Sequence, residues 1–221
     1  APAVAKAAIE SGAAAPIITD WDAYESKLRA LMGYDNKMIR RFTEMAVQNP
    51  KRVVFAEANH TNMLSAAVTA YQEGICFPIL LGNTDYIHSV AEQNGLNLDG
   101  LEIVNLRSGE ETERREKYAK ILAQKRQREG ITLDEAREKM FDRNYFGMMM
   151  VEVGDADAFI TGTYTKYTET IQIAKDVIGI REGHKHFGAM HIMNTKKGTY
   201  FLADTLINRH PDSETLVDIA R

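Results

Sequence analysis

Two clusters of polar residues follow short apolar runs. Each cluster lies where a predicted strand ends and a predicted helix begins. In open parallel sheets, ligands gather beyond the carboxyl ends of strands, where helix N-termini offer N–H groups. The first cluster is EANHT, residues 57–61. Capping by Asn59 or Thr61 explains those two side chains but neither Glu57 nor His60. We therefore keep Glu57, Asn59 and His60 as secondary candidates for ligand binding.

The second cluster, TGTYTKYT at residues 161–168, holds four threonines, two tyrosines, a glycine and a lysine. Hydroxyls, backbone N–H groups and one ammonium group suit an anionic, oxygen-rich ligand such as a phosphate. A long polar loop with capping threonines is the competing interpretation. The candidate ligand-binding residues of this cluster are Thr161, Gly162, Thr163, Thr165 and Lys166.

Two further sites are weighed in the same way. Asp204 follows the last predicted strand, where it is a base, a hydrogen-bond anchor or an ordinary turn residue. Lys125, Arg126 and Arg128 crowd the end of a long predicted helix. Cations favour helix C-termini by about 0.3–1 kcal/mol each, so a contact to a ligand phosphate is the less ordinary alternative.

Metal and nucleotide motifs are missing from the sequence. His184, His186 and His191 have no carboxylate or cysteine at ligand spacing, so no metal site is predicted. The sequence contains no P-loop, no G-x-G-x-x-G and no G-x-S-x-G. The methionines at 148–150 are expected in the core. No residue is predicted to be catalytic, and no cofactor is predicted for this chain.

The elements that would position these residues alternate between strand and helix. Predicted strands are 52–56, 77–81, 101–106, 158–161, 187–193 and 199–203. Predicted helices are 3–11, 21–32, 36–48, 61–73, 84–93, 110–129, 132–140, 144–153, 169–178 and one from 212. This order predicts an α/β fold with a mostly parallel sheet flanked by helices, and an antiparallel hairpin in the second half.

Composition excludes several classes of protein. The 221 residues are 44% hydrophobic and 26% charged, which excludes a disordered chain. The net charge of −4 argues against nucleic acid as a partner. The apolar run 75–81 is far shorter than the roughly 18–20 residues that cross a membrane. A single cysteine, Cys76, cannot form an internal disulfide, which favours a reducing, cytoplasmic location.

The ends of the sequence suggest a piece of a longer protein. The chain starts at Ala1 without a methionine or a signal peptide. It stops at Arg221 inside a helical pattern formed by Leu216, Ile219 and Ala220. We expect a fragment.

Four segments then resemble the phosphate acetyl/butyryl transferase family. They are KRVVFAEA, GICFPILLGN, DEAREKMFDRNYFGMMMVEVGDADAFITG and YFLADTLIN, in matching order and spacing over residues 51–221. The resemblance implies an isocitrate dehydrogenase-like, phosphotransacetylase-like fold, here truncated at its C-terminus. It also implies acetyl-CoA or a related CoA ester as ligand.

The first residues, APAVAKAAIESGAAAPI, resemble the end of the catalytic part of bacterial malic enzymes. Residues 1–50 would then hold the end of a malic enzyme domain, a linker and helices. Such a protein would be a homo-oligomer that oxidatively decarboxylates malate to pyruvate. Its NADP and its divalent metal, Mg or Mn, would bind to an upstream malic enzyme domain that is absent here.

The sequence departs from the transferase family where charge matters. An arginine and a proline of the family's S-G-A-x-H-[ST]-T-A-x-T-[IV]-R-P-A motif are replaced by Gln172 and Ile173. Arg126 matches another family arginine. A neutral amide gives a phosphate no charged partner, which favours a non-catalytic, allosteric domain that binds acetyl-CoA. The alternatives are an active phosphate acetyltransferase and an oligomerisation module without ligand.

Overall fold

The computed structural model describes residues 2–14, 18–21, 23–24, 27–28, 37–195 and 198–220. The chain divides into two compact units, one formed by residues 45–186 and the other by residues 1–44 with 187–221. The predicted division into regions 1–50 and 51–221 stays a prediction. Each unit is described below by itself.

The larger unit is built on a four-stranded parallel sheet. Its strands are β1 (Lys51–Phe55), β2 (Cys76–Leu81), β3 (Glu102–Val104) and β4 (Ala158–Ile160), in the order β3-β2-β1-β4. In the central register Val54 lies opposite Ile79 on β2 and Phe159 on β4. All three pairings are parallel. The predicted parallel α/β fold is therefore confirmed.

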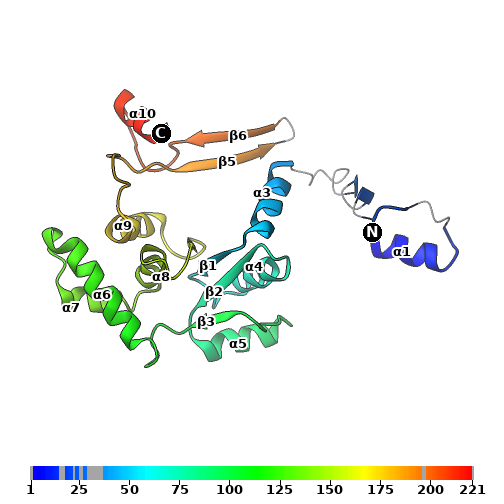
Figure 1. The fold of residues 1–221 in the computed structure, drawn as a ribbon, viewed down its shortest axis with the longest axis horizontal. Coiled ribbons are helices and arrows are strands. Elements are labelled where there is room, and N and C mark those ends of the chain that lie inside the picture. The colour runs from blue at the N-terminus through cyan, green and yellow to red at the C-terminus, as the bar shows by residue number, and fades with distance from the viewer. Residues whose placement is uncertain are drawn as a thin grey trace. The chain divides into compact units, whose positions relative to one another are not determined.

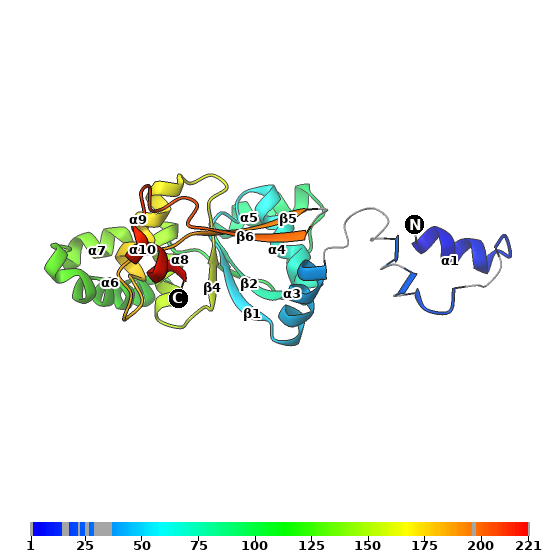
Figure 2. The ribbon, with the colours of Figure 1, turned by 90° about the horizontal axis from the view of Figure 1, so that it is seen from above.

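Alternate residues of the strands face two separate hydrophobic clusters, because successive side chains of a strand point to opposite faces. Val54 and Leu81 belong to one cluster, and Val53 and Phe55 belong to the other. Helices cover both faces, so the unit has three layers (Figures 1 and 2). The helices are α4 (Thr61–Gln72) and α5 (Thr84–Gln93) on one face, and α6 (Thr112–Arg126), α8 (Arg143–Glu152) and α9 (Tyr167–Val177) on the other.

The methionine-rich helix α8 lies in the core, as the sequence predicts. Met148, Met149 and Met150 are each no more than 5% exposed. The cluster that contains them also includes Tyr118 of α6 and Val177 of α9. Burial of apolar area at about 25 cal/mol per Å² holds these helices on the sheet.

Predicted caps account for several helix ends. Asn83 accepts a hydrogen bond from the N–H of Tyr86 at 2.9 Å and caps α5. Thr132 and Glu135 form a capping box at α7 (Leu133–Lys139). The predicted helix 110–129 is α6 followed by a 3₁₀ turn (Gln127–Glu129), and it ends at Gly130, whose φ of +90° lies in the left-handed region.

The cap of α4 differs from the expectation. Its N-cap is His60, not Asn59 or Thr61, and the His60 side chain makes no capping hydrogen bond. The imidazole ring instead stacks on the Tyr164 ring, with 3.5 Å between ring centroids and 20° between planes. The ring contact with another loop replaces the local cap.

The smaller unit contains helix α1 (Pro2–Glu10), the antiparallel strands β5 (Met190–Thr195) and β6 (Gly198–Ala203), and helix α10 (Ser213–Ala220). The predicted hairpin is confirmed, although its first strand begins at Met190 rather than at residue 187. Helix α3 (Lys37–Gln48) contains the boundary between the units. The predicted helix 21–32 lies largely outside the described residues. In the described part of the chain, no helix has the length and apolar character that a membrane span needs.

Candidate functional site

Glu57 organises the loop that follows β4. Its side chain lies just beyond β1 and is 1% exposed. The carboxylate accepts hydrogen bonds from the backbone N–H of Thr163 at 2.9 Å and of Tyr164 at 3.1 Å. The Thr165 hydroxyl donates a third bond at 2.9 Å. Two of the sequence-predicted clusters, residues 57–61 and 161–168, are thus in direct contact.

The Glu57 carboxylate is held in its charged form. Burial raises its pKa, but the hydrogen bonds from Thr165, Tyr164 and Thr163 together outweigh that effect and lower the pKa overall. A charged carboxylate therefore occupies the position in which a ligand anion would meet these donors. In this structure the donors of the loop bind an anionic side chain of the protein itself, whereas the predicted binding of a ligand anion stays a prediction.

The ends of the loop are also fixed by internal contacts. The Thr161 hydroxyl donates to Oδ1 of the buried Asn144 at 3.0 Å. Gly162 has a φ of +112°, which side chains of L-residues rarely adopt. Lys166 points to solvent, where its 82% exposed side chain lies 3.5 Å from Glu169. Lys166 is therefore the accessible cation of this loop.

Arg126 lies at the other end of α9 from the loop. Its Nε donates to the Asp176 carbonyl at 2.7 Å and its Nη2 to the Lys175 carbonyl at 2.6 Å. Its Nη1 pairs with Glu129 at 2.7 Å. The 11 residues of α9 span about 16 Å at 1.5 Å per residue. The structure thus does not bring Arg126 and the loop together, because the guanidinium group caps the last carbonyls of α9.

Gln172, which replaces the family arginine, belongs to a structural network. Its Nε2 donates to Asp176 Oδ1 at 2.9 Å, one helical turn further along α9. The Tyr145 hydroxyl donates to Asp176 Oδ2 at 2.6 Å, and Lys139 donates to that hydroxyl at 3.0 Å. Burial, with the adjacent Asp176 carboxylate, raises the pKa of Tyr145 well above its usual range. The network attaches α9 to α8.

Asp204 belongs to the smaller unit and connects two of its turns. It accepts hydrogen bonds from the N–H of Ala189 at 2.9 Å and from the backbone and side-chain nitrogens of Asn208, both at 2.6 Å. Burial raises its pKa, but these hydrogen bonds outweigh burial and lower it. Of the sequence interpretations, this geometry fits the hydrogen-bond anchor.

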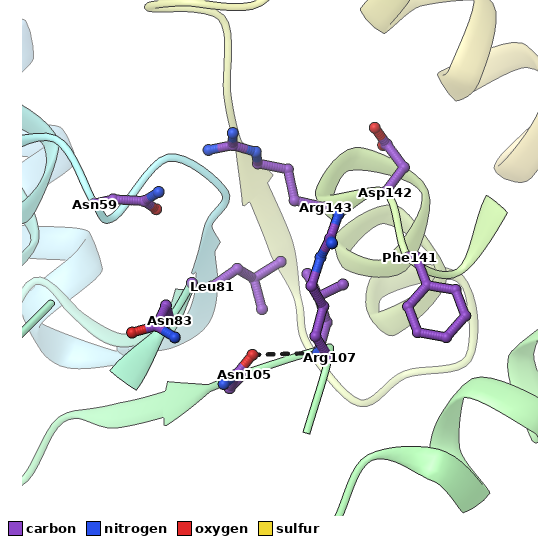
Figure 3. Close-up of a pocket in the computed structure, with 10 residues that line it drawn as sticks. Asn59, Leu81, Asn83, Asn105, Arg107, Phe141, Asp142 and Arg143 are labelled. Carbon is purple, nitrogen blue, oxygen red and sulfur yellow. Dashed lines mark hydrogen bonds between the residues drawn. The ribbon is translucent and has the colours of Figure 1, made fainter. Parts of the chain in front are cut away.

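A cavity of about 360 Å³ opens at the carboxyl ends of β1, β2 and β3 and at the connection between α7 and α8 (Figure 3). Arg107 follows β3 and Arg143 begins α8, and both side chains line the cavity. The amide end of Asn59 points into it from the loop after β1. The polar lining residues are Asn59, Asn83, Asn105, Arg107, Asp142 and Arg143.

Sequence reasoning found Asn59 but missed Arg107 and Arg143. The predicted clusters follow the strands that end before Glu57, Thr161 and Asp204, and they do not include the ends of β2 and β3. Applied to β3, the rule that ligands gather at strand ends finds Arg107 from the sequence. Arg143 has no such signal, since the approach of α8 to these strand ends depends on tertiary packing.

Comparison with known proteins places this geometry in a family. The family described as Phosphate acetyl/butaryl transferase matches residues 37–221. The chain belongs to the phosphate acetyl/butaryl transferase family. Among solved structures, the EutD phosphotransacetylase from Staphylococcus aureus and a phosphotransacetylase from Streptococcus pyogenes superpose with TM-scores of 0.71 and 0.74. Both are 24% identical and cover 83% of this chain and 55% of theirs, which confirms the fold.

Curated relatives of the chain have two kinds of name. The NADP-dependent malic enzymes of Salmonella typhimurium and Escherichia coli are 36% and 35% identical over 100% and 99% of this chain. The phosphate acetyltransferase of Thermoanaerobacterium thermosaccharolyticum is 33% identical over 83% of it. The chain spans 29% of each malic enzyme and 56% of that transferase.

Proposed function

We propose that the chain is a regulatory, phosphotransacetylase-like domain that binds acetyl-CoA or a related CoA ester within an NADP-dependent malic enzyme. One observation carries the assignment. Residues 1–36 lie outside the family match, yet the relatives named malic enzymes match 98–100% of the chain. The relatives named phosphate acetyltransferases match 80–83% of it. The segment before residue 37 therefore favours the malic enzyme context.

A regulatory role is favoured over acyl transfer because the polar groups of the site hydrogen-bond to other groups of the protein. Gln172 brings a neutral amide and binds Asp176. Arg126 caps α9, and Glu57 occupies the N–H groups of Thr163 and Tyr164. Stabilising the developing charge of an acyl-transfer transition state requires donors aimed at the reacting atoms. In this chain the donors instead bind carbonyl and carboxylate oxygens of the protein.

In the proposed protein, malate is oxidatively decarboxylated to pyruvate by a malic enzyme domain that holds NADP and Mg or Mn. Acetyl-CoA bound to the present domain changes the affinity for malate, and by linkage malate changes the affinity for acetyl-CoA by the same factor. Lys166, exposed on the loop after β4, provides a cation for a coenzyme phosphate.

The proposed protein is also a homo-oligomer, and the hairpin of the smaller unit supports this. Large apolar side chains are exposed on both strands of the hairpin. On β6 the exposed fractions are 49% for Tyr200, 54% for Phe201 and 42% for Leu202, and on β5 they are 58% for Met190 and 42% for Ile192. Contiguous exposed apolar side chains are typical of association surfaces.

The test uses the full-length protein and three measurements. Calorimetry measures acetyl-CoA binding, NADPH absorbance measures malate turnover with and without acetyl-CoA, and release of free thiol from acetyl-CoA and phosphate measures transferase activity. We expect binding, a change in malate kinetics and no thiol release. Thiol release at roughly 1–1,000 per second would establish the transferase alternative. Absence of binding would reject the regulatory role.

A further inference from the structure

The cavity at the ends of β1, β2 and β3 holds two guanidinium groups without partners. In the described part of the chain, the side chains of Arg107 and Arg143 form no hydrogen bond and no ion pair. The arginines of the same unit that shape its fold are bound, as Arg52 is to Asp157 and Arg137 is to Glu116. Two guanidinium groups without a bound partner thus line one cavity.

The asparagines of the cavity offer further donors. Asn83 Oδ1 accepts from the N–H of Tyr86 at 2.9 Å, and Asn105 Oδ1 accepts from the N–H of Arg107 at 3.2 Å. Each oxygen is thus used within its own turn. The Nδ2 groups of both asparagines have no bond within the described residues, so each remains a donor.

The carboxylate that lines the cavity, Asp142, offsets only one of the two positive charges. Asp142 Oδ1 caps α8 by accepting from the N–H groups of Asn144 at 2.8 Å and Tyr145 at 3.1 Å. The N-terminal ends of α5 and α8 border the cavity, and helix N-termini favour negative charge. Donors and positive charge therefore exceed acceptors, which excludes a metal cation and favours an anion.

The cavity also contains an unused acceptor. Asn59 Oδ1 is buried without a hydrogen-bond partner in the described structure. It packs close to Gly82, where a Cβ atom would approach it to 2.8 Å. A buried carbonyl oxygen without a donor is unfavourable, and a hydroxyl group of a ligand would satisfy it.

We propose that this cavity is a second anion-binding site, which takes the phosphate group of a small hydroxyl-bearing phosphate ester and is distinct from the coenzyme site. A phosphate offers three tetrahedral oxygens and can accept from Arg107, Arg143 and an asparagine amide at once. A carboxylate offers two oxygens in one plane. The volume of about 360 Å³ lies at the small end of the usual 300–1,000 Å³ for ligand pockets, so it suits a small metabolite.

The test measures binding by calorimetry on the full-length protein in a phosphate-free buffer at fixed ionic strength. The probes are inorganic phosphate, glucose 6-phosphate and succinate. We expect both phosphates to bind, and Arg107→Gln and Arg143→Gln each to weaken that binding about tenfold or more, the range for one lost charged hydrogen bond. Arg128→Gln, which removes an exposed charge outside the cavity, is the matched control and leaves binding unchanged.

Two further arms identify the ligand. If the natural ligand is a hydroxyl-bearing phosphate ester, Asn59→Ala lowers the affinity for glucose 6-phosphate and leaves the affinity for inorganic phosphate unchanged. An equal effect on both probes would overturn the role of the hydroxyl group. Succinate binding as tightly as the phosphates would overturn the choice of phosphate.

Acetyl-CoA binding is measured on the same variants, because coenzyme A itself contains phosphates. Unchanged acetyl-CoA affinity in Arg107→Gln and Arg143→Gln supports a separate site, whereas a parallel loss would merge the cavity with the coenzyme site. Phosphate binding that persists in both variants, or that is absent from the wild-type protein, overturns the proposal. Arg107 is exposed, so its variant is expected to fold, and thermal melting curves verify this.

Discussion

Glu57 and Thr163 are 106 positions apart in the sequence, and the backbone N–H of Thr163 donates to the Glu57 carboxylate at 2.9 Å. This bond joins the end of β1 to the loop after β4, the neighbouring strand of the sheet. Because Tyr164 and Thr165 donate to the same buried carboxylate, a single side chain fixes the path of the loop.

Replacement of Glu57 should therefore loosen this loop and destabilise the larger unit. Glu57→Gln keeps the size of the side chain but turns one acceptor into a donor, which faces an N–H group that is already a donor. We expect a loss of about 1–3 kcal/mol in the free energy of unfolding, measured by urea denaturation. Glu73→Gln, at the exposed end of α4, is the control. Equal stability of the two variants would contradict this role.

The same pair predicts a pH dependence. The pKa of Glu57 is lower in the folded protein than in the unfolded chain, so its contribution to stability is complete above the unfolded value of about 4.3. That contribution is lost as the pH falls through the folded pKa. Wild-type stability should therefore fall more steeply than that of Glu57→Gln below about pH 4.3. Parallel curves for both proteins in acid would count against the assignment.

Arg126 should behave as a structural cap. Its side chain is 16% exposed and binds the carbonyls of Lys175 and Asp176, so Arg126→Ala leaves these oxygens without donors. We expect a loss of about 1–3 kcal/mol in the free energy of unfolding, while Arg128→Ala, at an exposed site close by, has little effect. Arg126→Lys should recover part of the loss.

Acetyl-CoA titration of Arg126→Lys separates this role from a ligand contact. A cap predicts wild-type affinity in the folded variant. A loss of affinity of about tenfold or more, with stability retained, would show instead that the guanidinium group contacts the coenzyme.

Restoring the family arginine at position 172 should not create a transferase. In Gln172→Arg the new guanidinium group lies one helical turn from Asp176, the present partner of the glutamine, and an ion pair at this spacing is favourable. The charge is then held by Asp176. We expect no thiol release from acetyl-CoA and phosphate, and Gln172→Lys is the matched control. Release in the arginine variant alone would show that this one substitution abolished transferase chemistry.

The sequence predicts the architecture well because the signals are local. The run RVVFA forms β1, Asn83 caps α5, and Thr132 with Glu135 forms a capping box. Each depends on a few adjacent residues, so each is visible without the fold. The beginning of β5 is predicted less well, because Phe187 and Ala189 are apolar like several residues of the strand that follows.

The site is predicted less well because its polar groups bind residues that are far away in the sequence. Composition alone indicates that the loop with Thr163 binds an anion, but not that Glu57 supplies it. A cluster of cations includes Arg126, but its carbonyl partners lie 49 and 50 positions further along the chain. Asn59 is found as a candidate, and the two arginines that share its cavity are not. Residue types predict the chemistry, whereas packing decides which partner each group meets.

Packing also gives a prediction at Gly147, in the middle of α8. A Cβ atom there would lie 2.8 Å from Cδ2 of Phe159 and 3.1 Å from Cδ1 of Leu81, and it would clash with Cε2 of Phe159 as well. Gly147→Ala gains about 1 kcal/mol in helix propensity but overpacks the core, which typically costs about 1–3 kcal/mol. We expect net destabilisation in urea denaturation. Gly109→Ala, where nothing lies within 4 Å of the new atom, is the control and should be nearly neutral.

A double-mutant cycle identifies the clash as the cause. Phe159→Leu removes the ring that the new methyl group would meet, so Gly147→Ala should cost less in that background than in the wild-type protein. The interaction free energy between the two sites should be about 0.5–3 kcal/mol, the range for residues in contact. Additive effects of the two substitutions would mean that α8 shifts away from β4 without straining the Phe159 ring. The close packing of α8 on the sheet would then not explain why position 147 holds a glycine.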